Sequence, residues 1–122
     1  MPSKISLTEK LANFSDEWTP KIVAEANGQL FKLAKISGDF VWHKHDDEDE
    51  VFLVCKGRLT IQFRDHNVDL GPGEMCVVPK GIEHCPVADP GTEIMLIEPA
   101  NTQHTGTVAS QKTVAVEDQQ WI

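Results

Sequence analysis

Turn-forming residues interrupt this chain at short intervals, and that spacing restricts the fold more than any other feature of the sequence. Glycine, proline, asparagine and aspartate recur between residues 27 and 91 at roughly the 8–12-residue spacing of β-sandwiches and barrels. The stretches between them are rich in β-branched and apolar residues, which favours strands at 29–36, 40–45, 50–55, 58–63, 75–78 and 93–97. No stretch in this region has the length and pattern of a crossover helix. The sequence therefore predicts an all-β domain, with antiparallel strands closed into a two-sheet roll.

One short helix is expected before the strands begin. Ser6 and Glu9 have the spacing of a capping box, and apolar residues follow them at helical intervals. Trp18 and Pro20 then end the pattern.

Composition limits the class of protein. The 122 residues include 19 acidic and 11 basic side chains, for a net charge of -8, which disfavours binding to nucleic acid or to anionic membranes. We find no apolar run of the ~18 residues that a membrane span needs and no signal peptide. The three cysteines are odd in number and form no CxxC pair, so we expect a reducing, cytoplasmic location. The length suits a single domain over residues 1–122, with a polar C-terminal tail at 101–122.

Three histidines and a glutamate carry the candidate chemistry. His43 and His45 lie two residues apart in a predicted strand, so both imidazoles point to one face. A turn can return Glu50 to the same place, and the turn before His84 can direct a further ligand there. Three imidazole nitrogens and one carboxylate suit one divalent transition metal, namely Fe, Mn, Ni, Zn, Co or Cu, rather than calcium or magnesium. Glu48 is an alternative to Glu50 as the carboxylate ligand.

The spacing of these residues resembles the two motifs of the cupin family. The first motif is glycine, five residues, His-x-His, three or four residues, glutamate, six residues and glycine. The residues that match it here are Gly38, His43, His45, Glu50 and Gly57, with one residue fewer than the motif has after the first glycine. The second motif is glycine, five residues, Pro-x-Gly, two residues, histidine, three residues and asparagine. The residues that match it here are Gly73, Pro79, Gly81 and His84, and Ala88 stands in place of the asparagine.

The resemblance covers the motif core, residues 38–88, and implies a small single-domain cupin. The expected fold is therefore the cupin double-stranded β-helix, or jelly-roll barrel, with the metal ion inside it. The segment around Pro99 and Gly106 is also similar to the ends of short bacterial cupins described as mannose-6-phosphate-isomerase-like.

The resemblance also implies several functions. A cupin with this ligand set is expected to be a metal-dependent enzyme acting on a small molecule, either as a dioxygenase or as an isomerase of a sugar or sugar phosphate. Arg58 is a candidate substrate-binding residue, and no side chain beyond the ligands is identified as catalytic. A non-catalytic barrel that binds or senses a small molecule is the main alternative, and a structural role is another. The complete ligand set favours the enzyme.

We also expect a homodimer. The side-chain alternation that directs His43 inward places Trp42 outward, and Phe40 and Val51 are expected to share that outer face. An exposed apolar face of this kind usually marks an interface, and small single-domain cupins are commonly homodimers.

Overall fold

Antiparallel strands make up most of the protein, as predicted. The computed structural model describes residues 2–100 and 119–122. Within them lie, in chain order, α1 (Leu7–Leu11), β1 (Lys21–Ala26), β2 (Gln29–Asp39), β3 (Glu50–Lys56), β4 (Leu59–Phe63), β5 (Asn67–Leu70), β6 (Met75–Val78), β7 (His84–Pro99) and β8 (Gln120–Trp121). Most of the expected C-terminal tail, residues 101–118, lies outside the described residues.

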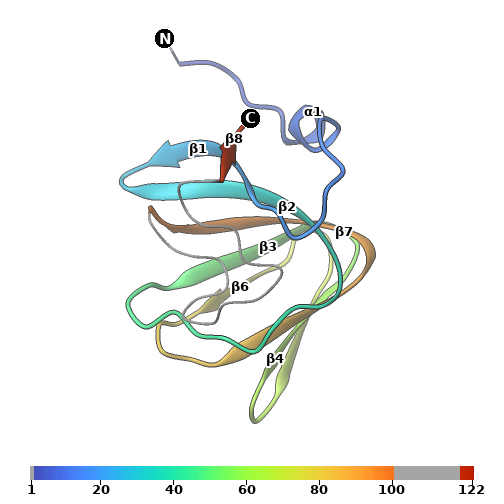
Figure 1. Ribbon diagram of the computed structural model, residues 1–122, viewed down its shortest axis with the longest axis vertical. Helices are drawn as coiled ribbons and strands as arrows, with labels where there is room; N and C mark the ends of the chain where they lie inside the picture. Colours follow the sequence, from blue (N-terminus) through green and yellow to red (C-terminus); the bar gives the residue numbers. More distant parts are fainter. Residues whose placement is uncertain (1, 101–118) are drawn as a thin grey trace.

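The strand β7 organises the barrel because it pairs with three other strands. The main sheet runs in the order β5-β4-β7-β2-β1-β8, and β3 pairs with β6 and with β7. The first part of β7 pairs with β4, its last part pairs with β3, and β2 follows it along both parts. Figure 1 shows β2 and β7 side by side across the molecule, with β1 and β8 at one end. A single bent strand thus joins the two halves of the roll.

The core lies inside the barrel, and alternation along each strand explains which residues reach it. In β3 the buried residues are Glu50, Phe52 and Val54, with partly exposed residues between them. The interior cluster also includes Ile36 of β2 and Ile61 of β4. Because side chains of one parity share one face of a strand, Glu50 points into the apolar interior together with Phe52 and Val54.

A second apolar cluster lies outside the barrel, under α1. Leu11 packs there with Val23, Leu33 and Met95. The helix begins as predicted, since the side chain of Ser6 accepts a hydrogen bond from the backbone N–H of Glu9. It ends at Leu11, well before Trp18 and Pro20, so it is shorter than the sequence pattern suggests.

The strand predicted over residues 40–45 is wrong. Residues 40–49 form an irregular segment in which only His43 makes an isolated bridge, to His84. Phe40 donates a backbone hydrogen bond to the carbonyl of Pro86. Pro86 has no N–H with which to continue the ladder, and this missing donor explains the interruption. In the described parts of the chain, no helix is both long enough and apolar enough to cross a membrane.

Candidate metal centre

His43 and His84 face each other across a two-stranded bridge. The N–H of His43 donates to the carbonyl of His84 at 3.0 Å, and the N–H of His84 donates back to His43 at 2.9 Å. This pair of bonds fixes the two Cα atoms opposite each other, and the ring centroids lie 4.3 Å apart. Two residues that are 41 positions apart in the sequence thus present neighbouring imidazoles.

The turn at Pro79 to Ile82 brings His45 and His84 together. The N–H of Ile82 donates to the carbonyl of Pro79, and Gly81 has a φ of +79°, a conformation that favours glycine. Gly81 also donates its N–H to the carbonyl of His45 at 2.7 Å. The Pro-x-Gly spacing read from the sequence therefore ties the two motifs to each other.

Backbone carbonyls set the orientation of two of the imidazoles. Nδ1 of His43 lies 2.8 Å from the carbonyl oxygen of Val41, and Nδ1 of His84 lies 2.9 Å from that of Ile82. Because a carbonyl oxygen can only accept, each Nδ1 carries the proton, and a neutral ring then keeps its lone pair on Nε2. Both Nε2 atoms are therefore available as metal ligands.

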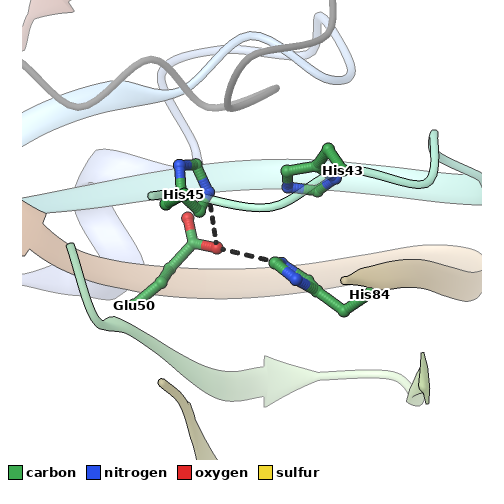
Figure 2. Close-up of side chains that lie close together, drawn as sticks. All are labelled: His43, His45, Glu50 and His84. Carbon is green, nitrogen blue, oxygen red and sulfur yellow. Dashed lines mark ion pairs between the residues drawn. The ribbon is translucent and has the colours of Figure 1, made fainter. Parts of the chain in front are cut away.

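The ligand atoms of the four residues converge in a buried space. Nitrogens of His43, His45 and His84 and a carboxylate oxygen of Glu50 all lie within 4.8 Å of one another. Figure 2 shows Oε1 of Glu50 between the rings of His45 and His84, at 3.2 Å and 3.4 Å from their Nε2 atoms. Ligands of one ion lie roughly 3–4 Å apart, since their bonds are about 2.0–2.2 Å long. The cluster thus has nearly the dimensions of a coordination sphere.

The polar atoms of this cluster fit a cation. All three Nε2 atoms and Oε1 of Glu50 are buried without a hydrogen-bond partner. Buried polar atoms are rarely left in this way, because each one costs about 1–3 kcal/mol. On His84, a lone pair faces a carboxylate oxygen, which is repulsive unless a positive charge lies between them. A divalent transition metal held by the four residues removes these penalties together.

Burial and neighbouring charges shift two of the ligand pKa values. Burial, followed by the charge of His84, lowers the pKa of His43 to about 4, so this ring is neutral at ordinary pH. Burial by itself raises the pKa of Glu50, but its close contacts with His45, His84 and Glu98 outweigh burial and lower that pKa well below its usual value. The two shifts leave a neutral imidazole and an ionised carboxylate, which are the forms that bind metal.

Comparison with known proteins now decides the family. A family model, Cupin_2, described as the cupin domain, matches residues 29–97 of the chain. The chain belongs to the cupin family.

Three known proteins illustrate the range of similarity. A cupin-2 domain containing protein from Shewanella frigidimarina NCIMB 400 is 50% identical, with a TM-score of 0.77 over 78% of this chain and 93% of that one. The protein YdbB of Bacillus subtilis (strain 168), described as uncharacterized, is 38% identical over 77 residues, which are 62% of this chain and 62% of YdbB. The match thus spans less than two-thirds of that curated relative. Hydroquinone 1,2-dioxygenase PnpCD, in complex with Fe3+, is 20% identical, with a TM-score of 0.68 over 78% of this chain and 32% of that one. That likeness shows the fold alone.

Two charged residues behind Glu50 were missed in the sequence. Lys32 of β2 and Glu98 of β7 are fully buried, and their Nζ and Oε1 atoms lie 2.8 Å apart. Burial and the adjacent Glu50 raise the pKa of Glu98 well above its usual value, against the opposing effect of Lys32. Glu98 also interacts with Glu50, so this cupin has a second carboxyl group beside its candidate metal ligands. A signal was present, because Lys32 and Glu98 each share the parity of buried apolar residues in their own strand.

The other candidate residues lie elsewhere. Arg58 is exposed and does not line the cavity beside the metal ligands. Glu48 is only partly buried, and its carboxylate accepts a hydrogen bond from the backbone of Asp47 instead of joining the cluster. Between the two acidic candidates, it is Glu50 that this cupin directs towards the histidines.

An apolar cavity adjoins the site. It is lined by His43 and Glu50 and by side chains from β2, β3 and β7, and it offers about 30 Å³ to the centre of a water molecule. Trp18 and Phe40 stack at its edge with ring centroids 4.6 Å apart. Phe40 was expected on an outer face with Trp42, and that expectation is wrong. The ring of Phe40 instead stands edge-on to His43 at 5.4 Å.

Proposed function

We propose that this cupin is a metal-dependent enzyme that acts on a small molecule, with one divalent transition metal held by His43, His45, Glu50 and His84. The observation that carries the proposal is the convergence of four buried ligand atoms without hydrogen-bond partners. The cavity lined by His43 and Glu50 supports it further, since a small molecule there would lie beside the ligands. A three-nitrogen, one-oxygen set suits Fe, Mn, Ni, Zn, Co or Cu.

The residues around the ion have separate tasks in this proposal. A bound ion of this kind supplies Lewis acidity or, as iron(II), reactivity towards dioxygen. The carbonyls of Val41 and Ile82 hold the rings of His43 and His84 in place. Glu98 lies next to Glu50 and pairs with Lys32 at 2.8 Å, and the apolar interior around Phe52 excludes water from the site.

Elemental analysis of metal content tests the proposal. The protein is purified without chelators or an affinity metal, beside His84→Ala and the control His66→Ala, which removes an exposed histidine in the turn before β5. We expect close to one transition-metal ion per chain in the wild type and in the control, and loss of that ion in His84→Ala. Equal metal content in all three proteins would contradict the assignment.

Turnover is tested on the metal-loaded protein. Oxygen uptake and isomerisation are screened with small metabolites, and any activity found should disappear in Glu50→Gln. Tight binding of a metabolite without turnover, whichever metal is loaded, would instead favour the alternative of a non-catalytic binding or sensing barrel.

We also propose a cytoplasmic homodimer. Met75 and Val77 of β6 are 56% and 54% exposed, and they pair in register with Leu53 and Val51 of β3. This apolar strip is a candidate contact surface. Light scattering should report about twice the chain mass of 13.6 kDa, and a monomer at micromolar concentration would contradict the dimer. Free thiols at Cys55, Cys76 and Cys85 are consistent with a reducing compartment.

A further inference from the structure

The cavity beside the metal ligands has almost no polar wall. Of the eleven described residues that line it, nine have apolar or aromatic side chains, and the two polar ones are His43 and Glu50. Both belong to the proposed ligand set, so the ion would occupy their polar atoms. The rest of the wall offers a ligand only van der Waals and aromatic contacts.

Among the residues that the structure describes, none that lines the cavity has a cationic side chain. Neither lysine nor arginine is among the residues that line the cavity in the described parts of the chain. Lys32, the nearby buried ammonium, is paired with Glu98 at 2.8 Å. A phosphate needs arginine, lysine or a nest of backbone N–H groups, and a polyol needs several polar partners. Both kinds of ligand would lose hydration here without replacement.

The aromatic edge of the cavity is held firmly in position. Trp18 has a φ of +59°, a conformation that non-glycine residues adopt only when the surroundings impose it. Its backbone N–H donates to the carbonyl of Lys35 at 2.9 Å, and its indole Nε1–H donates to the carbonyl of Ser37 at 3.2 Å. Two bonds to β2 thus fix the indole. Phe40 stacks on it with only 8° between the ring planes.

From these observations we infer the substrate class of the site: a compact, uncharged molecule with an aromatic or apolar body and a polar atom directed at the metal. Its body would lie against the Trp18–Phe40 pair and the aliphatic wall formed by Ile36, Ile94 and Leu96. This inference rests on the proposed metal-dependent function. It selects against sugars and sugar phosphates as substrates. The space of about 30 Å³ requires either a ligand of few atoms or an outward shift of the aromatic pair.

Binding of two probes tests the inference without any need for turnover. Phenol has an aromatic body and one polar atom, whereas glucose 6-phosphate is a charged polyol. Each is titrated into the metal-loaded protein while the indole N–H resonances are followed by NMR. The Trp18 resonance is assigned by its absence in Trp18→Ala. We expect phenol to shift this resonance in a saturable way and glucose 6-phosphate to leave it unchanged.

Variants separate a specific contact from general binding. Because Trp18→Ala lacks the reporting indole, the phenol affinities of the variants are measured by isothermal titration calorimetry. Trp18→Ala should weaken phenol binding about 3- to 10-fold, the usual effect of losing one aromatic contact. Trp121→Ala removes a tryptophan of β8 that is 58% exposed and should leave the affinity unchanged. If Trp18→Ala does not fold, Phe40→Leu keeps an apolar side chain and removes the ring, and it should weaken phenol in the same way.

The possible results distinguish this inference from the proposed function. If metal is bound but glucose 6-phosphate shifts the Trp18 resonance and phenol does not, the substrate class is overturned while the metal site stands. Phenol binding that is equally strong in Trp18→Ala, Phe40→Leu and wild type would also overturn it. If no metal binds but phenol still shifts the resonance, the proposed function fails and the apolar pocket stands.

Discussion

Replacing Lys32 with methionine should destabilise the protein strongly and in a pH-dependent way. The ammonium of Lys32 and the carboxyl group of Glu98 are both fully inaccessible to solvent, at a distance of 2.8 Å. The two residues are diagonal neighbours, because Lys32 pairs in register with Leu96, two residues before Glu98. Methionine has nearly the same length and leaves the apolar packing intact, so the substitution mainly removes the charge.

The magnitude follows from the burial of the pair. Removing one partner of a buried ion pair leaves the other uncompensated and typically costs about 3–5 kcal/mol. Domains of this size have total stabilities of roughly 5–15 kcal/mol, so the loss is a large share. With an m-value of about 1.5 kcal/mol/M, the urea midpoint should fall by about 2–3 M.

The pH dependence has a definite sign. The pKa of Glu98 is already raised by burial and by Glu50, and Lys32 is the group that opposes this rise. Without Lys32, the folded protein holds the Glu98 proton to a higher pH than the wild type does, and the difference from the unfolded chain increases. The folded state then binds more protons, so stability falls as pH rises above the ordinary glutamate value. Lys32→Met should therefore lower the free energy of unfolding more at pH 8 than at pH 5.

Urea denaturation in the presence of a chelator measures these effects on the metal-free protein. The matched variants are Lys32→Met, Glu98→Gln and the double variant, which together form a double-mutant cycle. The double variant should recover part of the stability lost in Lys32→Met, because it leaves no carboxyl group to ionise at Glu98. A loss below 1 kcal/mol in Lys32→Met, or a double variant no more stable than that single one, would refute the reasoning.

Three further predictions concern the site and the turns. The metal-free protein should gain about 3 kcal/mol of stability from His43 between pH 4 and pH 6.5. In this range the unfolded chain binds a proton at His43, whereas the folded ring, with its pKa of about 4, does not. Denaturation across pH measures the gain, which should be absent in His43→Gln. Glu98→Gln should weaken metal affinity about 10- to 100-fold, as expected for a residue that orients a ligand. Competition with a chelating dye measures this affinity, and an unchanged value would count against that role. Gly57→Ala should lower the free energy of unfolding by about 3 kcal/mol or more, because its Cβ would lie 2.5 Å from Oγ1 of Thr92 at a φ of +87°. The control Gly28→Ala, with a positive φ but no atom within 4 Å, should lower it by only about 1 kcal/mol. Thermal or urea unfolding measures both.

Local patterns in the sequence were sufficient for the fold class and for the grouping of the four candidate ligands. The turn residues and the β-branched runs predicted an antiparallel roll, and the cupin family is confirmed. Glu50 was placed by its spacing before Gly57, and the alternation of β3 directs it inward with Phe52. His84 was placed by the Pro-x-Gly turn, whose glycine conformation and Ile82–Pro79 hydrogen bond depend on adjacent residues. Such features are readable because they depend on neighbours within a few positions of the chain.

Features that depend on the pairing of distant strands were decided only by the tertiary structure. The segment 40–45 reads as a strand, but its ladder stops where Pro86 of a distant strand lacks a donor. Phe40 lies in the cavity because Trp18, which is fixed to β2 by two hydrogen bonds, provides the ring on which it stacks. Lys32 and Glu98 meet because β2 and β7 pair in one register, and a shift of one residue would turn the two side chains to opposite faces of the sheet. The sequence thus determined the candidate ligand set, whereas the register and closure of the barrel decided what surrounds it.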